Sequence, residues 1–311
     1  GIMSRLKVLK YLRSDYKINK DVKKFLRKVG GKNFFMFVNY AGVHEKPLGN
    51  KAKNLKELPI EDRKERNIRR FRNRQVNAEE AINNLIKILK KENSFENTLL
   101  VITSDHGESL YENASQEFQI DYDIFLEDNT YKGHGFSLYD PEINVPLIFY
   151  WKGLKHQLIR ETVRTVDIYP TILGILGIRK PKYLDGVDLF NDNISGLESY
   201  SEIPYINGDL KCIRTNKHKF IWSDRGHLEI YDIINDPLEK LNLKNDTKLV
   251  NFFKNKSMNM LAHFSQKPIE KTEIPEEVKK ELIGLGYMKD DWHETKKYYY
   301  GFTRWSSSRQ N

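Results

Sequence analysis

Short apolar runs alternate along this chain with longer segments of helical periodicity, and that alternation restricts the possible folds. The runs NFFMFVNY (33–40), LLVIT (99–103) and VPLIFYW (145–151) are too short for buried helices and too apolar for half-exposed strands. Continuous apolar strands of this kind are typical of parallel sheets that are covered on both faces. We therefore expect an α/β fold in which a mostly parallel sheet is flanked by helices.

Three segments have the pattern of helices. VKKFLRKV (22–29) places its apolar residues on one face before two glycines end the pattern, and a longer helix is expected over 76–89. The strongly charged stretch 51–70 is expected to be a solvated loop that leads into that helix. In PTILGILGI, Asp167 is expected to be the N-cap and Gly177 the C-terminal stop.

The pattern changes towards the C-terminus. KCIRTNKHKFIW and HLEIYDI flank the turn SDRG and indicate an antiparallel hairpin. Helical patterns near 252–264 and 276–287 are expected to pack on it. We therefore predict two parts: residues 1–197, belonging to a catalytic α/β domain, and residues 198–311, forming a small antiparallel sheet with a helix and a tail.

Composition restricts the partners and the location. The chain has 52 Lys and Arg against 43 Asp and Glu, a formal charge of +9 that favours anionic ligands. It has neither a zinc-finger spacing nor an aromatic RNA-binding stripe, so we expect no nucleic-acid partner. No segment reaches the roughly 18 apolar residues of a membrane span. The single cysteine, Cys212, fits a reducing compartment, and we expect a cytoplasmic location.

Polar groups suited to metal binding or proton transfer follow the expected strands, where the loops of a parallel sheet converge. They are His44, Asp105, His106, Lys132 and His134. The neighbouring carboxylate and imidazole of Asp105 and His106 can share one divalent cation if the backbone turns sharply, which Gly107 would permit.

Each of these residues also has a simpler interpretation. His44 alone would be a surface histidine, Asp105 a turn or cap residue, and His134 part of a turn between two glycines. Their joint placement at expected strand ends favours a site. Cys212 lies within an expected strand, which favours a buried structural thiol over a reactive one.

Several segments resemble, in order, the motifs of the sulfatase family within the alkaline-phosphatase superfamily. They are NYAGVHEKP, NLIKILKKENSFENTLLVITSDHGE, GHGFSLYDPEINVPLIFYWKG, VDIYPTILGILGI, LDGVDL, EIYDIINDPLEKLNL and ELIGLGYM. The resemblance covers roughly residues 33–290. It implies a metal-dependent hydrolase of sulfuric esters, acting on an anionic small molecule or a sulfated glycan.

The resemblance also implies roles for individual residues. Asp105 and His106 would bind one divalent metal, with Ca²⁺ expected first and Mn²⁺, Mg²⁺ or Zn²⁺ as alternatives because of the imidazole. His44 and His134 would contact the ester, one of them protonating the departing alcohol, and Lys132 would add a positive contact. Imidazolium, ammonium and metal all stabilise the negative charge that develops in the transition state.

Two family features have no counterpart in this sequence. The nucleophile motif C-x-[PA]-x-R is absent, because Cys212 lies in CIRTN, and so is the early aspartate pair. We therefore expect the chain to correspond to a C-terminal portion of a sulfatase-like protein and to be inactive alone. Alternatives are a phosphodiesterase or phosphoglycerol-type transferase of the same superfamily, and an inactive basic module that binds polyanions. The acidic stretch 117–128 is expected to be a solvated insertion.

Overall fold

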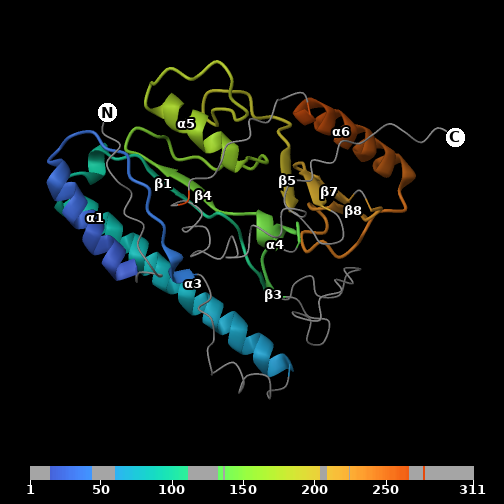
Figure 1. Cartoon of the computed structure of the whole chain (residues 1–311), viewed down its shortest axis with the longest axis horizontal. Helices are drawn as coiled ribbons and strands as arrows, with labels where there is room; N and C mark the ends of the chain where they lie inside the picture. Colours follow the sequence, from blue (N-terminus) through green and yellow to red (C-terminus); the bar gives the residue numbers. More distant parts are fainter. Residues whose placement is uncertain are drawn as a thin grey trace. The chain divides into compact units, whose positions relative to one another are not determined.

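The computed structural model describes residues 15–43, 60–110, 132–135, 137–203, 209–223, 225–265 and 276 (Figure 1). The chain divides into two compact units. The first consists of Gly1–Pro47, Arg72–Ser94 and Pro268–Asn311, and the second of Leu48–Phe71 and Phe95–Lys267. Every helix in the described part of the chain is too short or too polar to cross a bilayer.

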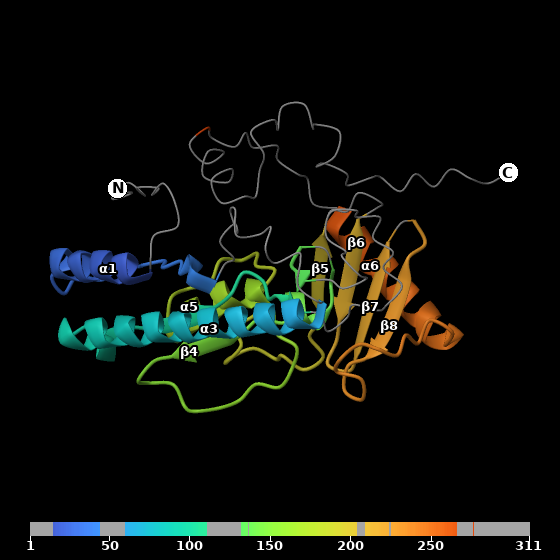
Figure 2. The ribbon, with the colours of Figure 1, turned by 90° about the horizontal axis from the view of Figure 1, so that it is seen from below.

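The described part of the first unit contains α1 (Asp15–Val29), the segment 30–43 that ends in the 3-10 helix η1 (Ala41–Val43), and the C-terminal part of α3 (Ile60–Lys91). α1 lies beside the C-terminal half of α3 (Figure 2), and both confirm helices expected from the apolar periodicity. The side-chain amide of Asn19 in α1 donates a hydrogen bond of 2.9 Å to the Ala81 carbonyl oxygen of α3. Because Asn19 is buried, this bond also satisfies a polar group that burial would otherwise leave without a partner.

The ends of these helices differ in how well the sequence predicted them. Gly30 and Gly31 adopt positive φ angles of 59° and 81° and end α1, as expected. By contrast, α3 starts at Ile60, in the middle of the stretch 51–70 that was expected to be a solvated loop passing into a helix start. Charged residues are compatible with a solvated helix, so charge alone did not distinguish the two structures.

The strand expected at 33–40 is wrong: these residues form no helix or strand. Their exposure alternates along the segment, and Phe35 and Phe37 are both 83% exposed. On the other side of the segment, the Tyr40 hydroxyl donates a 2.5 Å hydrogen bond to Asn19 Oδ1. An apolar run indicates a preference for burial, but a strand also needs a neighbouring strand for its backbone hydrogen bonds.

The expectation of a mostly parallel sheet is also not met among the described strands. β1 (Leu100–Thr103) and β4 (Leu147–Tyr150) form an antiparallel pair in which Val101 lies opposite Phe149. Every other strand pair in the described residues is antiparallel as well. Ile148, in the middle of β4, is half exposed, so these apolar runs are not buried on both faces here.

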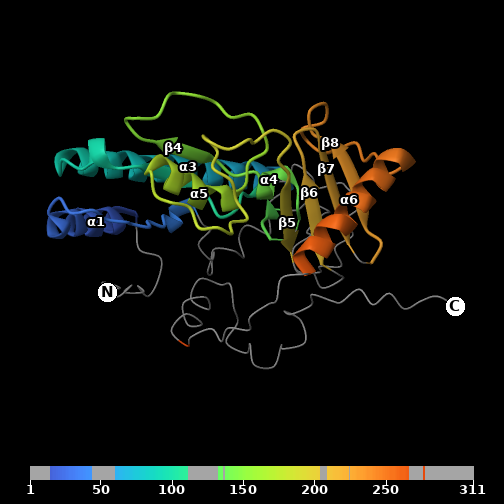
Figure 3. The same ribbon diagram turned by 90° about the horizontal axis from the view of Figure 1, so that it is seen from above.

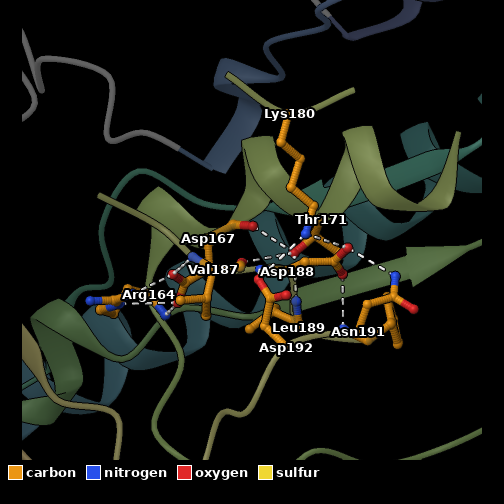
Figure 4. Close-up of polar contacts among 10 residues, drawn as sticks. Arg164, Asp167, Thr171, Lys180, Val187, Asp188, Leu189, Asn191 and Asp192 are labelled. Carbon is orange, nitrogen blue, oxygen red and sulfur yellow. Dashed lines mark hydrogen bonds and ion pairs between the residues drawn. The ribbon is translucent and has the colours of Figure 1, made fainter. Parts of the chain in front are cut away.

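The segment after β4 contains η4 (Thr165–Asp167) and α5 (Ile168–Ile175), and Figure 4 shows its polar contacts. Asp167 occupies the expected N-cap position, but its side chain does not cap α5. Its buried carboxylate instead accepts hydrogen bonds from the Arg164 guanidinium and backbone and from the Val187 N–H. Asp167 therefore links the start of α5 to the loop that follows the helix.

A second buried carboxylate packs against the same helix. Asp188 is enclosed by Lys180, whose Nζ lies 3.0 Å from Oδ2, and by the Asn191 side chain (Figure 4). A Cβ atom at Gly174 would lie 1.7 Å from Asp188 Oδ2, so glycine is required there. Gly177, with φ of 65°, follows the end of α5 as expected.

The C-terminal strands form the expected antiparallel sheet, in the order β5-β6-β7-β8. The strands are β5 (Ser199–Ile203), β6 (Leu210–Arg214), β7 (His218–Ser223) and β8 (Leu228–Asp232). α6 (Thr247–Ser265) covers one face (Figure 3) and confirms the helix expected near 252–264. The helix expected over 276–287 and the division at residue 198 stay predictions, the former lying almost wholly outside the described residues.

The two faces of this sheet pack against different parts of the chain. Ile213, Phe220 and Ile230 pack with Phe253 of α6 on one face. On the other, Cys212 and its neighbours pack with Leu138 and Tyr139. Cys212 is 1% exposed, and burial raises the pKa of its thiol to about 12, which confirms the expected buried thiol.

Packing of α6 on the sheet should depend on Phe253, which is 1% exposed and stacks on Phe220 at 5.4 Å between ring centroids. Phe253→Ala should lower the free energy of unfolding by about 3–5 kcal/mol because it leaves a cavity. The neighbouring Phe252 is 57% exposed, so Phe252→Ala should cost less than about 1 kcal/mol. Urea denaturation measures both, and equal losses would contradict the described packing.

Candidate functional site

The turn after β1, Ser104–Gly107, is fixed by its own polar groups. The Ser104 hydroxyl donates a hydrogen bond to the His106 carbonyl oxygen at 2.6 Å, and the His106 N–H donates to Asp105 Oδ1 at 3.0 Å. Such side-chain to backbone bonds are typical of Asx and Ser turns. The Asp105 side chain is 67% exposed, so a ligand from solution can reach it.

Gly107 is required by a close contact and not, as the sequence suggested, by an unusual turn. Its N–H donates a 2.7 Å hydrogen bond to the Glu142 carbonyl oxygen of α4 (Asp140–Ile143). A Cβ atom on Gly107 would lie 2.0 Å from the Pro141 carbonyl oxygen. The absence of a side chain thus allows α4 to lie directly against the turn that carries Asp105 and His106.

The orientation of His106 suits a metal ligand. Its Nδ1 lies 2.8 Å from the Gly107 carbonyl oxygen, which can only accept a hydrogen bond, so the neutral ring carries its proton on Nδ1. The lone pair is then on Nε2, which lies 3.7 Å from Asp105 Oδ2. A backbone carbonyl that fixes the tautomer in this way is the usual companion of a metal-binding histidine.

His134 is brought to the same place by a short antiparallel ladder. β2 (Ser109–Leu110) pairs with β3 (Lys132–Gly133), with Ser109 opposite Gly133. This places the residues that flank the ladder side by side. The rings of His106 and His134 stack with their centroids 3.8 Å apart and their planes inclined by 25°.

Glu108 orients His134 and changes its acidity. Its Oε2 lies 2.6 Å from His134 Nδ1. The hydrogen bond to Glu108 raises the pKa of His134; burial opposes this, and the charges of Glu108, Glu142 and Asp105 reinforce it. No role was expected for Glu108, although it closes the motif SDHGE and lies two residues beyond His106.

The structure brings together three of the five residues selected from the sequence: Asp105, His106 and His134. They do not lie at the ends of strands in one parallel sheet, because β1 and β3 belong to separate two-stranded antiparallel sheets. His44, the side chain of Lys132 and the acidic stretch 117–128 lie outside the described residues. The assigned roles of all five stay predictions.

The donor set is compatible with part of a metal site. Two donors 3.7 Å apart can bind the same cation at bond lengths of about 2.0–2.4 Å. Among the described residues, however, no group of three or more His, Cys, Asp or Glu is arranged to hold a metal ion. Asp105 and His106 therefore fit as two ligands, and a stable site requires more.

Comparison with known proteins gives the family. The family model Sulfatase matches residues 5–178, more than half of the chain. Arylsulfatase K of Canis lupus familiaris is 29% identical over 177 residues, which cover 51% of this chain and 30% of the relative. The Delta 4,5-hexuronate-2-O-sulfatase of Bacteroides thetaiotaomicron is 27% identical over 185 residues, covering 54% of this chain and 34% of the relative.

Solved structures show the same fold at low identity. The crystal structure of Ps i-CgsB superposes with a TM-score of 0.58 at 20% identity, covering 95% of this chain and 64% of that protein. BT1596, described as a 2-O GAG sulfatase, superposes with a TM-score of 0.55 at 18% identity, covering 79% of this chain and 57% of that protein. The match to the curated relatives spans about a third of their length. The chain belongs to the sulfatase family of the alkaline-phosphatase superfamily.

Proposed function

We propose that the protein hydrolyses sulfate esters with the help of a divalent cation bound by Asp105 and His106. The observation that carries this proposal is the grouping of a carboxylate, an imidazole with its free lone pair towards that carboxylate, and a second imidazole stacked on the first. Membership of the sulfatase family supports the reaction class. The remaining metal ligands and the nucleophile would come from elsewhere in the full-length protein.

A divalent cation at this place would stabilise the negative charge that develops on the ester oxygens. Asp105 would supply charge to the cation, and His106 a neutral nitrogen whose orientation is held by the Gly107 carbonyl. The resemblance to the family implies Ca²⁺ first. The imidazole ligand keeps Mn²⁺, Mg²⁺ and Zn²⁺ as alternatives.

His134 would supply the proton that the departing alkoxide needs. Because Nδ1 of His134 is hydrogen-bonded to Glu108, the proton for the ester would come from the other ring nitrogen, Nε2. The raised pKa keeps more of the imidazolium at neutral pH, which is the form that donates a proton. His44 and Lys132 would make further contacts to the anionic group.

We propose a sulfated glycan or a smaller anionic sulfate ester as the substrate. Ps i-CgsB was crystallised in complex with k-i-k-neocarrahexaose, and BT4656 with D-Glucosamine-2-N, 6-O-disulfate. The excess of positive charge in this chain would favour such a polyanionic substrate.

In the full-length protein, Asp105→Asn and His106→Ala should each lower kcat/KM for an aryl sulfate by about a hundredfold or more. Calorimetric titration with Ca²⁺ and Mn²⁺ should show weaker binding by both variants. His156→Ala, which changes an exposed histidine of the same unit, should leave activity and metal binding unchanged. Hydrolysis of an aryl phosphate in preference to the sulfate, or full activity of both site variants, would refute the proposal.

Glu108→Gln should lower the pKa of His134 towards its ordinary value near 6.5, because the charged acceptor is lost. The raised pKa means that the Glu108–His134 pair stabilises the protein below pH about 6.5, and that this contribution is lost as pH rises through the higher folded-state pKa. NMR titration of the imidazole protons in metal-free protein measures the shift. Glu96→Gln, at an exposed position, serves as the control, and a His134 pKa unchanged by Glu108→Gln would show that the pair does not form.

A further inference from the structure

We infer that the C-terminal sheet positions the Ser104–Gly107 turn, acting through a buried charge cluster of Lys219, Asp140 and Glu239. Lys219 is on β7, Asp140 begins α4, and Glu239 lies in the loop after β8. All three belong to the second compact unit. A role of this positioning in catalysis rests on the proposed function, but the dependence of the turn's position on the cluster does not.

The cluster is built around one fully buried ammonium group. Lys219 Nζ lies 2.5 Å from Asp140 Oδ1 and 2.6 Å from Glu239 Oε1, and both Lys219 and Glu239 are 0% exposed. The other oxygen of Glu239 accepts a 2.7 Å hydrogen bond from the Asp140 N–H. Glu239 therefore holds both the ammonium group and the first backbone N–H of α4.

Arg214 of β6 adds a second cation to the cluster. Its guanidinium donates two hydrogen bonds to the Asp140 carboxylate, at 3.0 and 2.9 Å. Burial raises the pKa of Asp140, but Arg214 and Lys219 outweigh burial and bring that pKa down to about 2. Asp140 is therefore ionised at all physiological pH values and joins two strands of the sheet to α4.

Such a cluster resists displacement, because moving one member leaves the others as uncompensated buried charges. The backbone at Glu239 supports this view: its φ is 53°, a conformation that residues other than glycine rarely adopt. Backbone strain of this kind persists only where the surroundings determine the position of the residue. The sheet therefore offers α4 a rigid support.

α4 transmits this support to the turn. It is one short helix, so the position of Asp140 determines the positions of Pro141 and Glu142. The Glu142 carbonyl oxygen accepts the Gly107 N–H bond at 2.7 Å, and the Pro141 carbonyl leaves no space for a Cβ atom on Gly107. A displacement of α4 would therefore move the backbone that joins His106 to Glu108.

The opposite face of the same sheet provides a matched control. Ile213 is 0% exposed and packs with Phe253 of α6, away from the cluster. Ile213→Val removes one methylene and should weaken the sheet without touching Asp140. A sheet that contributed only general stability would respond in the same way to changes on either face.

The test is hydrogen exchange of the Gly107 amide, measured by NMR in the metal-free protein. Wild type and Lys219→Met are compared at urea concentrations that give them the same free energy of global unfolding. Under these conditions Lys219→Met should accelerate the exchange of the Gly107 amide by about tenfold or more relative to wild type. Ile213→Val, matched in the same way, should leave it within about twofold. Asp140→Asn, which removes the negative charge between the two cations and replaces one acceptor oxygen by an NH₂ group but keeps the size of the side chain, should reproduce the effect if Lys219→Met fails to fold.

A further variant separates buried charge from packing. In Lys219→Met the Glu239 carboxylate is left buried without its cation, so adding Glu239→Gln should restore part of the Gly107 protection. The inference would be overturned if the Gly107 amide exchanged at the same rate in Lys219→Met and Asp140→Asn as it does in Ile213→Val. This measurement uses neither metal nor ester. A finding that the site binds no metal or has no activity would therefore refute the proposed function but not the coupling between the sheet and the turn.

Discussion

The buried ammonium group of Lys219 imposes the strongest constraint on the second unit. A cation without solvent must be surrounded by acceptors, and its two carboxylates come from α4 and from the loop after β8. Lys219 of β7 can therefore be buried only where these two segments supply their carboxylates. The segment containing α4 and the C-terminal sheet thus depend on each other for stability, although the sequence pattern changes between them.

The candidate site contrasts with this cluster in its exposure. Asp105 is largely exposed and His134 is partly buried, and both belong to short segments with few ladder hydrogen bonds of their own. Their geometry depends on local bonds, such as that from His106 Nδ1 to the Gly107 carbonyl, and on the contact with α4. Exposed polar side chains on a rigid support could bind a charged molecule without reorganising.

Local sequence patterns predicted the elements whose stability is local. The turn SDRG predicted the hairpin that β7 and β8 form, and α1 ends at two glycines that adopt positive φ. The segment 211–222, expected to be one strand, is divided between β6 and β7, and no strand was expected at β5. Pairing between distant strands was not predictable in this way. The apolar run at 33–40 forms no strand, and β1 with β4 is antiparallel and half exposed, because an apolar run carries no information about its partner or its direction.

The same limit applies to charged residues. Asp105 and His106 were selected because they are adjacent metal-binding residues at the end of an expected strand, and Glu108, in the same motif, was given no role. Lys219 in HKFIWS resembles an ordinary exposed strand residue, since its burial depends on Asp140 and Glu239, which are distant in the sequence. A single sequence shows the types of charged groups but not the partners that make their burial possible.

The geometry at Asp105 and His106 also bears on the choice of cation. Ca²⁺ prefers six to eight oxygen ligands, whereas a neutral imidazole nitrogen suits Mn²⁺ and Zn²⁺ better. The Gly107 carbonyl oxygen accepts a hydrogen bond from the Nδ1–H of the neutral His106 ring, so Nε2 carries the lone pair. Nε2 can then bind a cation but cannot donate a hydrogen bond to an oxygen ligand of that cation. A divalent cation bound by Asp105 and His106 would therefore have one oxygen and one nitrogen donor from this turn, whichever metal it is.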